Sequence, residues 1–593
     1  MLRLVIILLS LLWVAPCFAA YTMPIGVPDP VSSWGGTQDP IDDLPPARPG
    51  DWSSEVAGYY YINPQTGTTQ TWGTPASPRA TFPTAPGAGS YIEAHGNYTG
   101  VLTINCGGTS AAWSANSAGP VWIVGYEGEE PTFQNQVVLR GSYCYVDNVN
   151  TGANGANTGR IQTSTQTDAV AYVADHMVIR NSNIVGNTAE GAYADGGISI
   201  NGSTVGNSNS SYILVYNNTI HDIGLATCDN TADPEPACSD AHAVFVTSYA
   251  SNVWILSNSI HDARGAGVSV TATETTIATA HHIYVGKNTV YNTWQAGLAI
   301  KYGQHVIFSQ NTVHDIVDCT WSMGKGIGAQ YDPRDYWVIF NHIYNVTRGV
   351  HFASLDSGAT GPLFVVGNVI HDCNWAEFGG NYDVTYDSST GYTTGGITLW
   401  DIRNTRVVGN TIYDADTGIS TVSTNAALNC SIENNIISTR SQSLGREIYI
   451  AGGANYQVHK NVFYSPLGNR FKYGSGDYTT VAALQTAMGA NATGNISDNP
   501  LLLNPPTNMS INSGSPAKET GLPAASLQVD VYALFLATYG LSIQYDYAGT
   551  SRPVGEWDMG AYEFFGFSDT LIFGIKTFTQ PNLRGARFGA SVQ

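Results

Sequence analysis

Cationic and imidazole side chains recur at matching positions of one repeated pattern in the middle of the chain. Lys301, Lys325 and Arg348 lie at fixed offsets from the glycine that opens three short apolar stretches, GLAI, GIGA and GVHF. His351 lies in the third of these stretches, and His242 takes an analogous position in an earlier one. The chain has only 24 Lys and Arg among 593 residues. These cations are modestly enriched in this part of the chain, but their alignment at shared positions of the repeat is more informative than their number.

These residue types can remove a proton next to a carboxylate. A lysine can act as a base where neighbouring cations favour its neutral form, whereas an arginine neutralises anions but hardly releases a proton. β-Elimination from a uronic acid needs a cation for the C5 carboxylate, a base for the α-proton and an acid for the leaving oxygen. Lys325 or Arg348 is the candidate cation for the carboxylate, and Lys301 is the candidate base. The candidate acid is His242, His351 or Tyr302.

The same positions predict a groove that binds a polymer. Small outward residues beside the cations, such as Ala299 and Gly328, would leave it shallow, and aromatic rings near it could stack on sugar rings. The residues assigned to substrate binding are Tyr302, Gln330, Tyr331, Trp400 and Asp401.

An internal repeat supplies the scaffold. The pattern Asn-x-Ile/Val-x-Asp/Asn recurs every 23 to 42 residues, with clear copies starting at Asn218, Asn258, Asn288, Asn311, Asn341, Asn368 and Asn410 and weaker ones at Asn435 and Asn461. Each copy is followed by a second short strand, which opens with a glycine in examples such as GVSV at Gly267 and GLAI at Gly297, and a third apolar stretch precedes the next Asn. Three short alternating strands per turn of about 25 residues describe a parallel β-helix.

The repeat makes specific structural predictions. Val268, Val270, Leu298 and Ile300 should point inward, and Lys301 outward. The recurring Asn should form an internal ladder that satisfies backbone groups. The His and Tyr residues at the fourth repeat position should stack, and the Asp residues that follow should serve the turns rather than bind a metal. No metal ligand set is identified.

From about Ala85 to Pro466 the chain resembles the right-handed parallel β-helix proteins of the pectate-lyase-like superfamily. The stretch IKYGQHVIFSQNT is similar to the segment that carries the catalytic Lys in the alginate lyase and chondroitinase B-like lyases. The resemblance implies an all-β solenoid with capping segments and a basic role for Lys301. The family's Arg one turn on falls on Gln330, and its calcium-binding acidic pair falls on Trp294 and Ala296. Calcium is therefore a possible cofactor, but the sequence identifies no residues that would bind it.

The ends of the chain predict an exported protein. Residues 1–20 combine Arg3, an apolar run and small residues near a cleavage site, as in a secretory signal peptide. The predicted parts are then an N-terminal capping segment (21–84), the β-helix (85–466), a C-terminal capping segment (467–563) and a tail (564–593). We expect a secreted, periplasmic or extracellular location without stable membrane insertion, and a disulfide between Cys228 and Cys238.

Three function classes follow. The formal charge of −21 and the lack of a basic stripe exclude a nucleic-acid partner. The cationic columns favour a polysaccharide lyase acting on an anionic, uronic-acid polysaccharide, and an epimerase would use the same groove. A glycoside hydrolase with paired carboxylates is the second class, with Asp240, Asp332, Asp335 and Asp401 as candidates. A non-enzymatic adhesin or fibre protein is the third.

Overall fold

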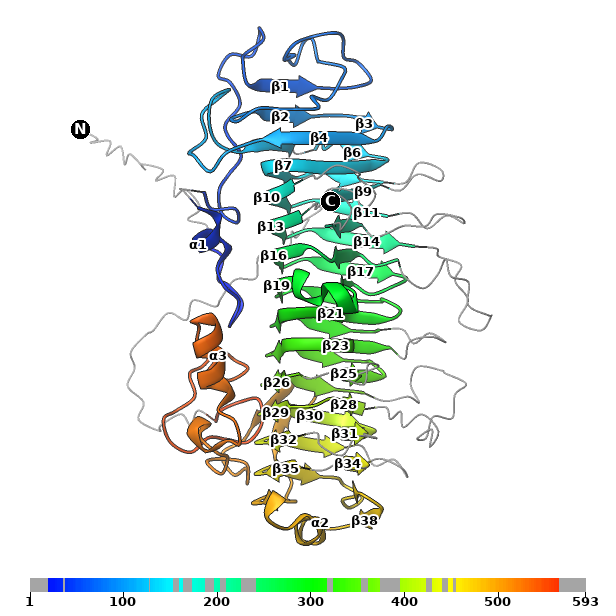
Figure 1. Ribbon diagram of the computed structural model, residues 1–593, viewed down its shortest axis with the longest axis vertical. Helices are drawn as coiled ribbons and strands as arrows, with labels where there is room; N and C mark the ends of the chain where they lie inside the picture. Colours follow the sequence, from blue (N-terminus) through cyan, green and yellow to red (C-terminus); the bar gives the residue numbers. More distant parts are fainter. Residues whose placement is uncertain are drawn as a thin grey trace, which may run out of the picture.

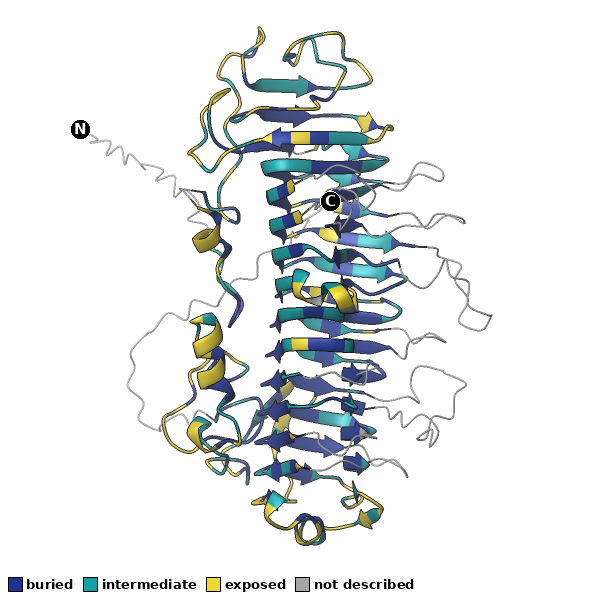
Figure 2. Cartoon of the chain, in the orientation of Figure 1, coloured by how far each residue is buried: buried dark blue, intermediate teal, exposed yellow. Residues whose placement is uncertain are grey.

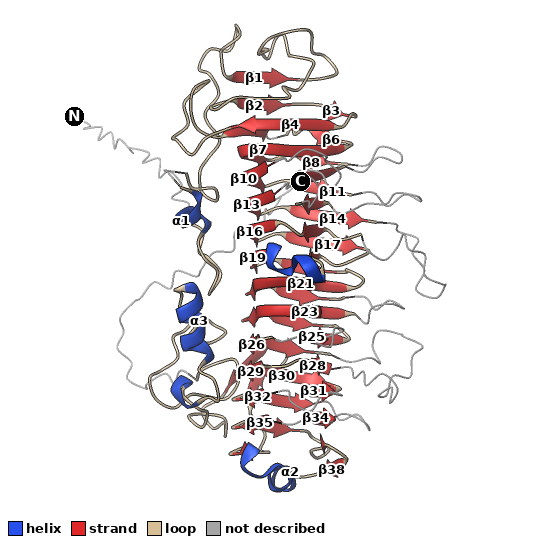
Figure 3. Cartoon of the chain, viewed as in Figure 1, coloured by secondary structure: helices blue, strands red, loops and turns tan. Residues whose placement is uncertain are grey.

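The protein, seen in a computed structural model, is an all-β, right-handed parallel β-helix (Figures 1 and 3). The structure describes residues 20–35, 38–126, 128–152, 159–163, 173–186, 197–202, 209–224, 241–316, 324–353, 361–373, 395–422, 429–439, 446–451 and 455–564. Each coil contributes three strand segments, one to each of three faces, as the repeat predicts.

The first face carries the glycine-led strands. Its central strands are β15 (Val244–Thr247), β18 (Val268–Thr271), the first half of β21 (Ala296–Ser309), the first half of β23 (Lys325–Ile339), β25 (Arg348–Ala353), β28 (Gly395–Trp400) and β31 (Thr417–Val422). The second face continues with β16 (Ala250–Leu256), β19 (His281–Gly286), the second halves of β21 and β23, β26 (Leu363–Val366) and β29 (Thr405–Val408).

The third face holds the Asn-x-Ile/Val-x-Asp motif. From the copy at Asn218 onward, its strands are short and pair in parallel: β14 (Thr219–Ile223), β17 (Ser259–Ala263), β20 (Thr289–Tyr291), β22 (Thr312–His314), β24 (His342–Tyr344), β27 (Val369–His371), β30 (Thr411–Ala415), β33 (Ile436–Thr439) and β36 (Val462–Tyr464). Along each strand every second side chain points into the coil. On the first face, Val268, Val270, Leu298 and Ile300 lie in the continuous core as predicted.

A ladder of buried asparagines runs along the inside of the turn before the third face, as predicted. At Asn341 the backbone N–H and the side-chain Nδ2 both donate to Oδ1 of Asn368, at 2.8 and 3.0 Å, and Nδ2 also donates to the carbonyl of Phe308 at 2.9 Å. The same pattern links Asn218, Asn258, Asn288, Asn311, Asn341, Asn368, Asn410, Asn435, Asn461 and Asn495. Each amide therefore satisfies polar groups of its own coil and of both neighbouring coils.

The outer surface of the third face carries the predicted ring stack. Successive rings lie 4.7–5.2 Å apart and within 3–14° of parallel, in the order His221, His261, Tyr291, His314, Tyr344 and His371. Nδ1 of each of these histidines lies 2.6–2.7 Å from the carboxylate of the Asp that follows it. Those Asp residues have φ of 51–56°, the left-handed turn conformation that Asp tolerates. Their recurrence is therefore turn chemistry, as predicted.

The second face is covered by both ends of the chain. The N-terminal segment with α1 (Pro30–Trp34) and the C-terminal segment with α3 (Val531–Tyr539) lie along it one after the other (Figure 1). Trp254 donates its Nε1–H to the carbonyl of Pro28 at 2.8 Å, and Trp337 packs between Phe364 and Phe535. The strands beneath are buried (Figure 2), so this face is closed by the protein itself.

The coil extends beyond both predicted boundaries, and its C-terminal end is covered by a helix. The parallel ladder starts at β1 (Tyr59–Ile62), which pairs with β2 (Tyr91–Ala94), so it begins before Ala85. It runs past Pro466 to β39 (Ala492–Thr493), and α2 (Val481–Met488) places Leu484 and Met488 on the last coil's core.

A disulfide joins Cys106 to Cys144 in neighbouring strands β4 (Leu102–Gly107) and β7 (Gln136–Asp147), a pair that the sequence analysis missed. The predicted Cys228–Cys238 disulfide and residues 1–19 of the predicted signal peptide lie outside the described residues. In the part of the chain that is described, no helix is long and apolar enough to span a membrane.

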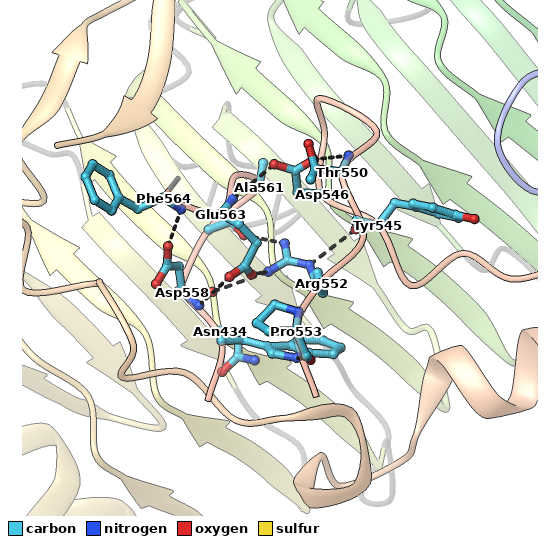
Figure 4. Close-up of polar contacts among 12 residues, drawn as sticks. Asn434, Tyr545, Asp546, Thr550, Arg552, Pro553, Asp558, Ala561, Glu563 and Phe564 are labelled. Atoms are coloured by element: carbon cyan, nitrogen blue, oxygen red, sulfur yellow. Dashed lines mark hydrogen bonds and ion pairs between the residues drawn. The ribbon is translucent and has the colours of Figure 1, made fainter. Parts of the chain in front are cut away.

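Arg552 holds the C-terminal segment to the β-helix through a buried polar cluster (Figure 4). Its guanidinium pairs with Glu563 and donates to the carbonyl of Gly560 at 2.9 Å. Gly560 in turn donates its N–H to the carbonyl of Asn434 on the solenoid at 2.7 Å. Burial raises the pKa of Asp546, Asp558 and Glu563, in the last case to about 7, because one guanidinium does not balance three buried carboxyl groups.

Replacing Asn341 by alanine should destabilise the solenoid strongly. The change removes the acceptor of two donors of Asn311 and leaves the carbonyl of Phe308 without its amide donor. We expect unfolding to become easier by about 3 kcal/mol or more, at about 1–3 kcal/mol per buried unsatisfied group. Urea unfolding followed by circular dichroism measures it. Asn97→Ala, at an exposed position of β3 (Asn97–Tyr98), is the control, and equal losses in both variants would contradict the ladder's role.

Glu563→Gln should flatten the pH dependence of stability. A carboxyl group whose pKa is higher in the folded state stabilises the fold fully below its unfolded pKa and loses that contribution as the pH rises through about 7. Between pH 5 and pH 8 the wild type should therefore lose stability relative to the variant, by up to about 3 kcal/mol. Thermal melts of the wild type, Glu563→Gln and the exposed control Glu556→Gln over that range test this, and a constant difference would refute it.

Candidate functional site

The first face aligns the candidate residues in columns, as the offsets from each glycine predict. Lys325 pairs with Ala296 on one side and with Arg348 on the other. A second column runs Ser269, Ala299, Gly328, His351 and Thr398. Because neighbouring coils are about 4.8 Å apart, Lys325, Arg348 and His351 lie within two adjacent coils.

Lys301 lies at an irregularity in the ladder. Ile300 pairs with Ala329 and Tyr302 with Asp332, so Gln330 and Tyr331 together oppose the single residue Lys301. Tyr331 takes the left-handed conformation, with φ 67°, and its ring stacks on Tyr302 at 4.9 Å and 13°. A bulge of this kind redirects side chains and is common beside active sites.

A small hollow of about 30 Å³ opens beside this bulge. Its walls come from β18, β21 and β23 together with the residues just before β15 and β21. The lining residues are His242, Ser269, Gln295, Ala296, Ala299, Ile300, Lys301, Lys325, Gly328 and Gln330. The structure thus brings together His242, Lys301, Lys325 and Gln330, four of the predicted site residues, and no Asp or Glu belongs to the lining among the residues described.

Glycines shape the wall of the hollow. A Cβ at Gly265 would lie 2.6 Å from Nδ1 of His242, and one at Gly328 would lie 3.1 Å from Cδ of Lys325. Both side chains therefore pack directly onto backbone that has no side chain of its own. The N–H of Ala266 donates to Nδ1 of His242 at 2.9 Å, which leaves the ring proton on Nε2.

The cations behind the hollow are buried. Lys325 is 7% exposed, and Arg348 and His351 are each 1% exposed. Burial, followed by the charges of Arg348 and Lys325, lowers the pKa of His351 well below its usual range. His351 is therefore neutral near pH 7, and the local positive charge comes from the Lys and Arg side chains, which interact with other groups of the chain as well.

Two predicted substrate-binding residues lie away from the hollow. Trp400 pairs with Ala353, which pairs with Gln330, so Trp400 is two coils beyond Gln330, about 10 Å along the axis. Asp401 follows it at a half-buried turn with φ 49°. They extend the same face but do not line the hollow.

The candidate carboxylates of a hydrolase do not converge in the described structure. Asp332 is buried and pairs with Arg334 at 3.0 Å. Asp335 contacts His305, Trp337 and Tyr539 at 2.6–2.9 Å, where α3 packs against the second face. Asp240 lies outside the described residues.

Gln295 also belongs to the lining and was not predicted from the sequence. It precedes the column of Ala296 and Lys325 by one residue, so the offsets from the glycine carried a signal for it. The bulge at Tyr331 did have a signal that was passed over: Pro333 lies two residues after it, and a proline within a sheet is confined to edge strands, strand starts and bulges.

No protein-family model matches the chain, and no curated protein matches it. Among solved structures, pectate lyase Pel9A is similar over 86% of this chain and 97% of that one, at 11% identity and a TM-score of 0.35. A mutant of the periplasmic alginate epimerase AlgG matches over 64% and 79%, at 11% identity and a TM-score of 0.35. The GH136 lacto-N-biosidase from Eubacterium ramulus matches over 70% and 67%, at 11% identity and a TM-score of 0.31. These likenesses concern the fold alone.

Proposed function

We propose that the protein is an exported enzyme that cleaves an anionic, uronic-acid polysaccharide by β-elimination on the first face. The observation that carries the proposal is the hollow itself, where Lys301 and Lys325 meet His242 and Gln330 with no carboxylate in the described lining. Such a site attracts a carboxylate and offers an amine beside it. The proposed location is the periplasm or the outside of the cell.

In the proposed reaction, Lys325 and Arg348 supply the positive charge that receives the C5 carboxylate. The amine of Lys301 removes the proton from C5, and the electron pair of that C–H bond moves into the carboxylate group as an enediolate. The enediolate then collapses to a C4–C5 double bond while the C4–O bond breaks. Positive charge near the carboxylate favours this step because it stabilises the enediolate more than the ground state.

The leaving oxygen must receive a proton, and Lys301 in its ammonium form is the group that carries one. The two histidines are less suited to this role than the sequence suggests. His351 is neutral and buried, and the Nδ1 of His242 is occupied by the N–H of Ala266. His242 can instead donate a hydrogen bond from Nε2 to an oxygen in the hollow.

The open first face also argues against a plain rod. In a rod the three faces would be interchangeable, but here both ends of the chain cover the second face, whereas on the first face a hollow opens among the residues that the structure describes. A hydrolase would need two carboxylates facing one bond, and the described Asp332 and Asp335 are engaged in contacts elsewhere.

Lys301→Ala should abolish formation of unsaturated uronate, measured as ultraviolet absorbance on a panel of uronic-acid polysaccharides with and without calcium. Loss of a general base lowers the rate by about 10²- to 10⁴-fold. Lys301→Arg keeps the charge but removes the base, so it should bind polysaccharide and fail to cleave it. Lys460→Asn, a lysine on a turn of a distant coil, is the control and should cleave at the wild-type rate.

Exchange of the C5 proton for deuterium without unsaturation would identify an epimerase at the same site. No unsaturation and no exchange on any uronan, with new reducing ends on a neutral glycan, would overturn the proposal in favour of a hydrolase. A Lys301→Ala variant that cleaves as fast as the wild type would remove Lys301 from the mechanism.

A further inference from the structure

The ring column on the third face is interrupted at Ser438. His371 pairs with Tyr413, Tyr413 with Ser438, and Ser438 with Tyr464. Every described position of this column from His221 to Tyr464 carries a ring, except Ser438. In the stack, one ring per coil fills the space between its neighbours, so a serine leaves that space open.

The size of the gap follows from the coil spacing. Tyr413 and Tyr464 lie two coils apart, about 9.6 Å along the axis, whereas neighbouring rings in the stack lie 4.7–5.2 Å apart. One further ring therefore fits between them. A cavity of about 300 Å³ opens at this place, which is the lower end of the range for small-ligand sites.

The walls of this cavity combine apolar surfaces with polar groups. Its lining residues are Tyr413, Asp414, Ser438, Thr439, Tyr464, Pro466, Asn499, Pro500, Leu502 and Pro505. The last four come from the C-terminal segment, which folds back over this face. Tyrosine rings and prolines suit the C–H faces of a ring ligand, and the carboxylate, amide and hydroxyl groups suit its edge.

The hydroxyl of Ser438 indicates that a ligand of this cavity would be polar at one edge. Ser438 lines the cavity, and the residue as a whole is 5% exposed. The hydroxyl of its neighbour Thr439 donates to Glu447 at 2.8 Å. A serine hydroxyl can donate one hydrogen bond and accept others, so a ligand hydroxyl in the cavity could bond to Ser438.

The charge of the lining residues argues against an anionic ligand. The described lining contains the carboxylate of Asp414 and no Lys, Arg or His, so a uronate would be repelled. A flat ligand with apolar faces and an edge of hydroxyl groups fits both the rings and the polar rim. We propose that the gap at Ser438 binds one neutral hexopyranose unit of a glycan, sandwiched between Tyr413 and Tyr464.

This site is separate from the hollow on the first face and takes a ligand of different charge. It stands on the third face, four coils further along the chain, and it requires no catalytic activity. The two proposals can therefore fail independently.

Ser438→Tyr tests the proposal because it completes the ring column and fills the gap. Calorimetry with the full-length protein and neutral oligosaccharides of glucose, mannose and galactose should show binding by the wild type and at least a tenfold loss of affinity in this variant. Tyr464→Ala, which removes one wall, should lose about tenfold. Ser438→Ala keeps the gap and should lose only about two- to tenfold, and Lys301→Ala should bind as the wild type does.

Melting curves establish that each variant is folded, and Tyr464→Ala carries the test if Ser438→Tyr is not. The proposal is overturned if none of the neutral oligosaccharides binds the wild type, or if both Ser438→Tyr and Tyr464→Ala bind with unchanged affinity. It is also overturned if a phenolic compound binds in the gap and the sugars do not, because the slot would then be an aromatic site.

Discussion

The buried asparagine ladder sets the register of the coils on which the other features depend. Each amide bonds to the coil before it and to the coil after it, so a coil cannot slip without breaking polar contacts in a dry interior. The columns on the outer faces inherit this register. The pairing of Lys325 with Arg348 and the placing of Ser438 between two tyrosines are both consequences of it.

The ladder leaves the three outer faces free to differ, because it lies inside the coil. The second face carries large apolar side chains such as Trp254 and Trp337, and the chain's own ends cover them. An exposed strip of that kind would invite aggregation. The first face carries small residues and cations, and the third face carries rings. One scaffold thus presents a closed face, a positively charged one and an aromatic one.

The sequence predicts most of the fold because the repeat encodes it. Three strands per turn, inward Leu298 and Ile300, the amide ladder and the ring stack all follow from the position of a residue within its copy. The columns of Lys325 and His351 follow in the same way. The repeat does not predict the places where the structure is irregular. The bulge opposite Lys301 depends on how two neighbouring coils pair. The Cys106–Cys144 disulfide lies N-terminal to the clear copies, where the repeat does not show which strands are neighbours.

Ser438 shows how a weak copy of a repeat can be informative. The copy NIIS at Asn435 looks degenerate by sequence, yet Asn435 keeps its place in the ladder. The ring position and the Asp or Asn that follows it have changed, to Ser438 and Thr439, and the C-terminal segment that lies over them is remote in sequence. The cavity therefore arises from a local loss of pattern and a long-range contact together, and sequence periodicity can reveal only the first of these.

The net charge of the chain limits how a polyanion can be recognised. At −21, the protein repels an acidic polysaccharide at long range, although salt screens this repulsion beyond about 8 Å under physiological conditions. Attraction at the first face must then act at short range, through Lys301, Lys325 and Arg348. Burial of the last two residues strengthens such attraction, because charges out of water interact in a lower dielectric. A neutral unit held between Tyr413 and Tyr464 would meet no such repulsion, so the two faces can select different parts of a mixed glycan by different forces.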